Sequence, residues 1–280
     1  MIEPQGAAKP TVEESAGIIR DLLAVWRHRE VNRLIPILDG SPTRGISALS
    51  HADHAASLSD SVLLLVEHDM IVQAVPLVRL TMECGITGAW FSVTPGSGES
   101  ANLEAARLRR AAIADLAIIS GSDPDVETAK LNATVDAFAG YESVEARKFV
   151  DRARSIGGAE WVYGYCRLLS AYCHGGNLLV DHYVNIDPGE PLGWSYRDGG
   201  DFAHAEIAIA IQAVMLCLAI RASDDLAPEH PKRAKLDEIS SRIGLFASIV
   251  RRGAGKESAY GASPVDSPGL AEPIASPHEK

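Results

Sequence analysis

Apolar side chains recur along most of this chain at intervals of three or four residues, the spacing that places them on one face of an α-helix. Alternating β-branched runs are scarce. The pattern predicts an all-α fold, a bundle of about eight helices. Clear helical runs cover residues 11–38, 46–67, 71–91, 99–120, 160–174, 201–222 and 231–252, and weaker, more polar ones cover 125–139 and 144–155.

One long stretch, residues 177–200, lacks this spacing. Its run LLVDHYVNI, followed by Asp187-Pro-Gly and then GWSYR, predicts a long loop or a short hairpin. Asp201, directly after it, is expected to cap the next helix.

A single domain is expected over residues 11–252, with 123–157 as a candidate peripheral lobe. The tail 253–280 is rich in Gly, Ala, Ser and Pro and has no apolar periodicity, so we expect it to be disordered. The same expectation holds for residues 1–10.

A narrow polar line runs along the apolar helix at 160–174, EWVYGYCRLLSAYCH. Glu160, Tyr163, Arg167, Ser170 and His174 are three or four residues apart and therefore share a face. The residues between them are mostly apolar, whereas a surface helix shows a broad polar face. The segment is predicted to be a buried helix with one polar seam.

A second polar line occurs in the apolar helix at 71–91, where Arg79, Glu83 and Thr87 follow one another at four-residue spacing. Buried charges are costly unless they are paired and hydrogen-bonded. Two interpretations are open: an Arg79–Glu83 pair on a partly exposed strip, or a pair that faces the 160–174 seam across the bundle. The second predicts a polar centre that includes Arg79, Glu83, Ser170 and Tyr163.

The spacing of Arg167 and His174 resembles the motif of HEPN domains, in which an arginine is followed after four to six residues by a histidine. Many HEPN proteins are helical, metal-independent RNases of toxin–antitoxin and phage-defence systems. The resemblance implies that Arg167 and His174 are catalytic and meet their counterparts in a dimer cleft. There His174 would transfer a proton as the RNA 2′-hydroxyl attacks its phosphate, and Arg167 would hold the phosphate charge.

The two seams together also resemble a bacterial helical family without an assigned function. That family combines R-x-x-x-E on an apolar helix, here Arg79 and Glu83, with S-x-x-x-H on a later helix, here Ser170 and His174. The resemblance implies a helical fold with a shared polar centre and implies no reaction.

The formal net charge of −11 argues against sequence-specific DNA binding and against adhesion to anionic membranes. The first ten residues lack the basic start and apolar core of a secretory signal, so a cytoplasmic location is expected. His51 and His54 share a helix face, but no Glu-x-x-His motif of a di-metal bundle occurs. No metal and no cofactor are expected.

Two functions remain open from the sequence. One is an interaction or ligand-binding module whose polar centre is a hydrogen-bonded network between helices, with a protein or small-molecule partner. The other is a HEPN-like metal-independent RNase or RNA-binding protein of defence or stress response. A homodimer is a candidate assembly for either.

Overall fold

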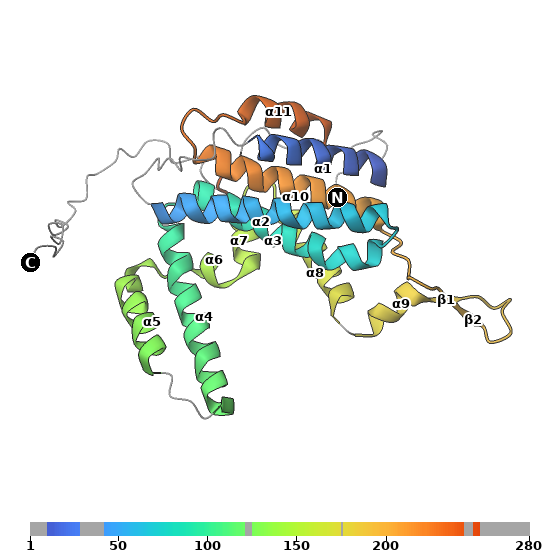
Figure 1. Cartoon of the computed structure of the whole chain (residues 1–280), viewed down its shortest axis with the longest axis horizontal. Coiled ribbons are helices and arrows are strands. Elements are labelled where there is room, and N and C mark those ends of the chain that lie inside the picture. The colour runs from blue at the N-terminus through green and yellow to red at the C-terminus, as the bar shows by residue number, and fades with distance from the viewer. Residues whose placement is uncertain (1–9, 29–41, 121–124, 175, 244–248, 253–280) are drawn as a thin grey trace, which may run out of the picture.

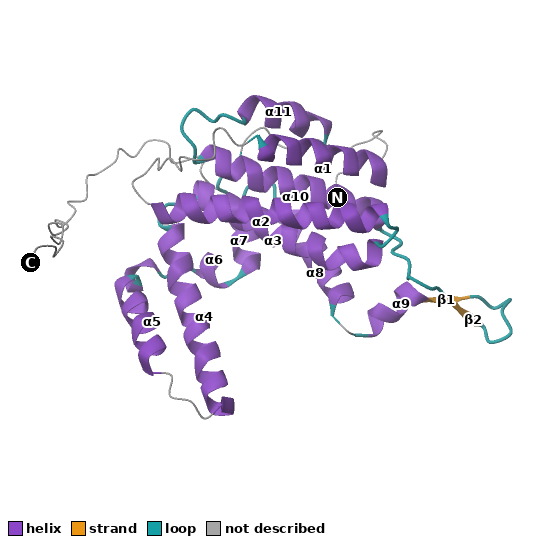
Figure 2. Ribbon diagram, in the orientation of Figure 1, coloured by secondary structure: helices purple, strands orange, loops and turns teal. Residues whose placement is uncertain are grey.

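The computed structural model describes residues 10–28, 42–120, 125–174, 176–243 and 249–252. Within them the chain forms eleven α-helices, two 3-10 turns and one two-stranded hairpin (Figures 1 and 2). The predicted all-α class is confirmed. The α-helices are α1 Val12–Arg27, α2 Pro42–Glu67, α3 Ile71–Val93, α4 Ser97–Ser120, α5 Asp125–Ala137, α6 Val144–Arg147, α7 Phe149–Ser155, α8 Glu160–Cys173, α9 Val180–Tyr183, α10 Ala205–Asp225 and α11 Arg233–Arg242.

Helix α1 begins with a capping box. The Thr11 hydroxyl accepts a hydrogen bond from the Glu14 backbone N–H, and the Glu14 carboxylate accepts one from the Thr11 backbone N–H. The helix ends at Arg27, earlier than the sequence pattern suggests. Residues 29–38 of the expected helix lie outside the described residues, as do the segments 1–9 and 253–280 that were expected to be disordered.

The core forms where α2, α3 and α10 pack together, with α1 against α10 and α11 outside α1 (Figure 1). Of the described helices, only α10 is long and apolar enough to cross a membrane by length and composition, and 67% of that window is buried inside the protein. Burial of this extent is typical of a core helix. Gln212 of α10 is fully buried and donates to the Ser59 hydroxyl of α2 at 2.7 Å and the Thr81 hydroxyl of α3 at 3.1 Å.

Helices α3 and α10 approach each other closely at a glycine. A Cβ atom on Gly85 would lie 2.8 Å from the backbone oxygen of Met215 in α10, closer than real side chains come. One turn later, a Cβ on Gly88 would lie 3.5 Å from the Cβ of Ala222. The lack of a side chain at Gly85 therefore sets how near the two most apolar helices can lie.

Helix α4 leaves this body and forms a projecting arm with α5 (Figure 1). Of the expected lobe at 123–157, the arm includes α5, whereas α7 packs against α3 and α6 contacts both α7 and α4. The single helix expected at 144–155 is divided at Lys148, whose backbone is extended, with φ −128° and ψ 122°.

The segment expected to be a long loop or hairpin contains both helix and strand. A 3-10 turn at Asn177–Leu179 leads into α9, and β1 (Val184–Ile186) then pairs antiparallel with β2 (Trp194–Tyr196). Asp201 does not cap the next helix, because α10 begins only at Ala205 and the Asp201 carboxylate instead accepts a hydrogen bond from Arg197 at 2.7 Å.

Candidate functional site

Helix α8 lies at the surface, so the prediction that it is buried is wrong. Only Val162, Cys166 and Leu169 are buried, while Trp161 and Leu168 are 39% and 40% exposed. One face of α8 packs against α3, and α7 and the following 3-10 turn touch its ends. Towards its ends α8 also meets α10, where Trp161 lines a small cavity, and α9, where the ring centres of Tyr172 and His182 are 4.8 Å apart. Trp161 and Leu168 nevertheless remain in contact with solvent.

The structure contains a feature of each interpretation of the α3 seam: Arg79 and Glu83 form a partly exposed pair within α3, and Arg79 also reaches Ser170 of α8. The guanidinium of Arg79 donates from Nη2 to Glu83 Oε1 at 2.7 Å and from Nε to the Ser170 hydroxyl at 2.6 Å. Ser170 donates onward to the backbone oxygen of Cys166 at 2.6 Å. The Arg79 and Glu83 side chains are 32% and 34% exposed, so the network is half-buried.

Three other residues of the predicted site stay outside this network. Arg167 is exposed, with its guanidinium carbon 6.0 Å from the centre of the Tyr163 ring. His174 is exposed at the end of α8, where its backbone N–H donates to Ser170. The structure therefore brings Arg79, Glu83 and Ser170 together and leaves the two candidate catalytic residues in solvent.

The α3 seam continues one turn further to a cation that sequence reasoning missed. Arg152 of α7 donates from Nη1 to the Thr87 hydroxyl at 2.7 Å, and its guanidinium lies 5.8 Å from the Trp90 ring centre. Its Nε is buried without a hydrogen-bond partner, and no ion pair joins it to a carboxylate among the described residues. Burial lowers the pKa of Arg152, and the negative charge of Glu83 opposes this shift.

Arg152 lines a pocket of about 500 Å³ between α2, α3 and the α6–α7 segment. Its charged lining groups are mostly neutralised by neighbours. Glu83 is paired with Arg79. Arg147 is paired with two carboxylates, with Nε 3.7 Å from Glu104 Oε2 and Nη2 3.3 Å from Glu142 Oε2. The lining residues are Ser50, His51, His54, Leu80, Glu83, Cys84, Thr87, Arg147, Phe149 and Arg152.

Two further groups define the chemistry of this pocket. Burial lowers the pKa of His51, and the nearby charge of Arg152 adds to the effect, so its ring is neutral at pH 7. Its Nδ1 lies 2.8 Å from the Ser47 backbone oxygen, which can only accept, so Nδ1 carries the proton and Nε2 has a free lone pair. Burial raises the pKa of Cys84 to about 12, so this thiol is not a nucleophile at neutral pH.

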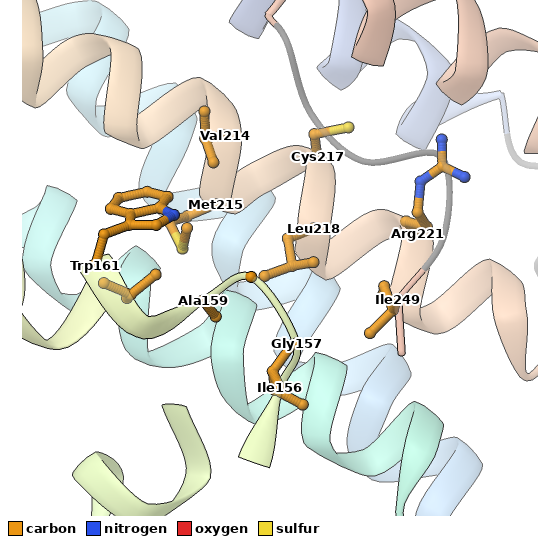
Figure 3. A pocket seen from close by; sticks show the side chains of 12 residues that line it. Ile156, Gly157, Ala159, Trp161, Val214, Met215, Cys217, Leu218, Arg221 and Ile249 are labelled. Carbon is orange, nitrogen blue, oxygen red and sulfur yellow. The ribbon is translucent and has the colours of Figure 1, made fainter. Parts of the chain in front are cut away.

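A second cavity, between the start of α8, α10 and the segment 249–252, is small and apolar (Figure 3). Its volume is about 50 Å³, and Trp161, Met215 and Leu218 are among its lining residues. Arg221 at its edge is engaged by Asp237 and by the Ser240 hydroxyl. The cavity is too small for an ordinary ligand and presents no unpartnered polar group of Arg221.

Neither metal chemistry nor a relative identifies the site. Across the ranges that the structure describes, no three His, Cys, Asp or Glu side chains gather as metal ligands would. Comparisons of the chain with protein-family models, with curated proteins and with solved structures found no match.

Proposed function

We propose that this protein is a non-enzymatic binding module that holds a small anion in the pocket between α2, α3 and α7. Arg152 anchors the ligand. The observation that carries the proposal is the part-buried guanidinium of Arg152, which lines the pocket, donates to the neutral Thr87 hydroxyl and makes no ion pair among the described residues.

The energetics of burial support an anionic ligand. A part-buried guanidinium is costly without a counter-charge, and a carboxylate or phosphate group in the pocket supplies that charge. Glu83 is already held by Arg79, so it compensates Arg152 only in part. A pocket of about 500 Å³ lies within the range that small molecules occupy.

The remaining groups favour a ligand with a donor as well as an acid group. The His51 Nε2 lone pair accepts a hydrogen bond from a hydroxyl or amine. Leu80 and Phe149 contribute apolar surface to the lining of the same pocket. The ligand class is therefore a small hydroxy or amino acid, or a phosphorylated analogue.

Calorimetric titration with acetate, lactate and inorganic phosphate tests this proposal. Arg152→Gln should weaken the binding of whichever probes the wild type binds about tenfold or more, because a charged hydrogen bond contributes about 1.5–3 kcal/mol. Arg154→Gln is the matched control, since Arg154 lies on the same helix and is 64% exposed. Absence of binding by the wild type, or equal loss in the two variants, would refute the proposal.

A second candidate function is metal-independent RNA cleavage of the HEPN type by Arg167 and His174, in defence or stress response. The observation in its favour is that both side chains are exposed on α8 and can reach a polymeric substrate. An RNA-cleavage assay without added metal should show activity that His174→Ala abolishes. Equal activity of the two proteins, or none in either, removes this candidate.

A further inference from the structure

The projecting part of α4 carries an exposed apolar stripe. Leu108 and Leu116 are 63% and 62% exposed, and Ile119 is 82% exposed. Together with the exposed Ala112 they are spaced by four, four and three residues, which places them on one face of the helix. Large apolar side chains gathered on one face in this way mark an interaction surface.

The arm that bears this stripe has little core of its own. Beyond Ala106 in α4, and over the part of α5 whose burial is described, no residue is buried. Two antiparallel helices cannot enclose a hydrophobic core, whereas four can. A second arm of the same kind would therefore complete what this one lacks.

We propose that two copies of this chain dimerise through their α4 arms, which pack antiparallel about a two-fold axis at Ala112. In that arrangement, residues equally far from position 112 on opposite sides meet at the same height. Leu108 then meets Leu116 of the partner subunit. Ile119 meets the small Ala105 of the partner subunit, which is also exposed.

The charges beside the stripe favour this orientation. Arg109 and Asp115 are both exposed, and neither makes an ion pair with another described residue. They flank position 112 at equal distance, so each lies at the height of its opposite charge in the partner. A parallel, in-register pairing would instead bring like charges together, which disfavours it.

Light scattering coupled to size exclusion, on the full chain, tests the dimer. The wild type should be a dimer, and Leu116→Glu should raise its dissociation constant about tenfold or more, because a charge replaces a buried apolar contact. Ile118→Glu is the matched control, because Ile118 is as exposed as Ile119 but lies off the stripe. A monomeric wild type, or equal dissociation by both variants, overturns the proposal.

Charge exchange tests the register separately. Arg109→Asp and Asp115→Arg should each weaken the dimer, since each places two like-charged pairs across the axis. The double variant restores opposite charges only in the antiparallel arrangement and should recover the wild-type dissociation constant. A double variant weaker than either single one overturns the register. Circular dichroism on each variant verifies that the helices are retained.

Discussion

Replacing Gly85 with alanine should lower the free energy of unfolding by about 2 kcal/mol, although alanine is the better helix former. In the middle of an ordinary helix, Gly→Ala is stabilising by about 1 kcal/mol. Here the new Cβ would lie 2.8 Å from the Met215 backbone oxygen and 3.3 Å from its Cα. Because these are backbone atoms of α10, no side chain can rotate away and the two helices must separate. Overpacking of this kind costs about 1–3 kcal/mol, and the upper end of that range outweighs the gain in helix propensity.

Gly164 provides the matched control. It is exposed in the middle of α8, and a Cβ there meets nothing within 4 Å. Gly164→Ala should therefore stabilise the protein by about 0.5–1 kcal/mol.

Thermal and urea unfolding of both variants provide the measurement. For a chain of this size, 1 kcal/mol corresponds to about 2–4 °C in melting temperature, so Gly85→Ala should melt about 4–8 °C lower than the wild type. Gly164→Ala should melt a few degrees higher. If Gly85→Ala is as stable as the wild type, the close approach of α3 and α10 at Gly85 does not limit their packing, and the reasoning is refuted.

Three further outcomes follow from the network and the pocket. Ser170→Ala should lower the free energy of unfolding by about 1 kcal/mol, because Arg79 loses an acceptor that water can partly replace. His174→Ala should leave the free energy of unfolding unchanged, and urea unfolding of both variants measures the difference. The free energy of unfolding should fall as the pH drops below 6.5, because the unfolded chain protonates His51 while the folded chain, in which the His51 pKa is lowered, resists. His51→Gln should flatten that dependence between pH 7 and 5, and an unchanged slope would contradict it. The Cys84 thiol, with its pKa of about 12, should react with a disulfide reagent at pH 8 only after unfolding. Rapid labelling of Cys84 itself in the native protein would contradict this.

The meeting of α3 and α8 could be anticipated from the sequence. Arg79 and Glu83 stand four residues apart in an otherwise apolar helix, and a charged pair in such a place needs further hydrogen-bond partners. The 160–174 segment carries polar residues at the same three- or four-residue spacing and could therefore supply such partners. The contact of Arg79 with Ser170 agrees with one of the two interpretations that the sequence leaves open, and the partial exposure of the Arg79–Glu83 pair agrees with the other.

The burial of α8 could not be read from its own residues. A 3.6-residue period shows which side chains share a face, but not which other helices arrive to cover that face. Helix α3 covers one face of α8 and other elements reach only its ends, so Trp161 and Leu168 stay partly exposed. The role of Arg152 could not be predicted for the same reason, because in the sequence it is only one cation in a basic segment. Its placement depends on the extended backbone at Lys148, which separates α7 from α6.

Gln212 shows a signal that could have been used. A single amide in the run IAIQAVMLCLAI has no room on a polar face and must find partners inside the core, here Ser59 and Thr81. Arg79 and Glu83 give the same signal in α3 more plainly, because each carries a charge and the Gln212 amide does not.

Glu83 links the two halves of the α3 seam, and its removal should change stability and ligand affinity in opposite directions. Its carboxylate oxygen Oε1 accepts a hydrogen bond from Arg79 Nη2 at 2.7 Å. Its negative charge also stabilises the positive charge of Arg152 in part. Glu83→Gln deletes that negative charge and leaves two cations without a carboxylate. The protein should therefore be less stable by about 1 kcal/mol, since the pair is half-exposed, while an anion in the pocket should bind more tightly because nothing competes for Arg152. A variant that loses both stability and anion binding would mean that Glu83 shapes the pocket rather than opposing the ligand. Tighter binding by a less stable protein is the result that electrostatic competition at Arg152 predicts.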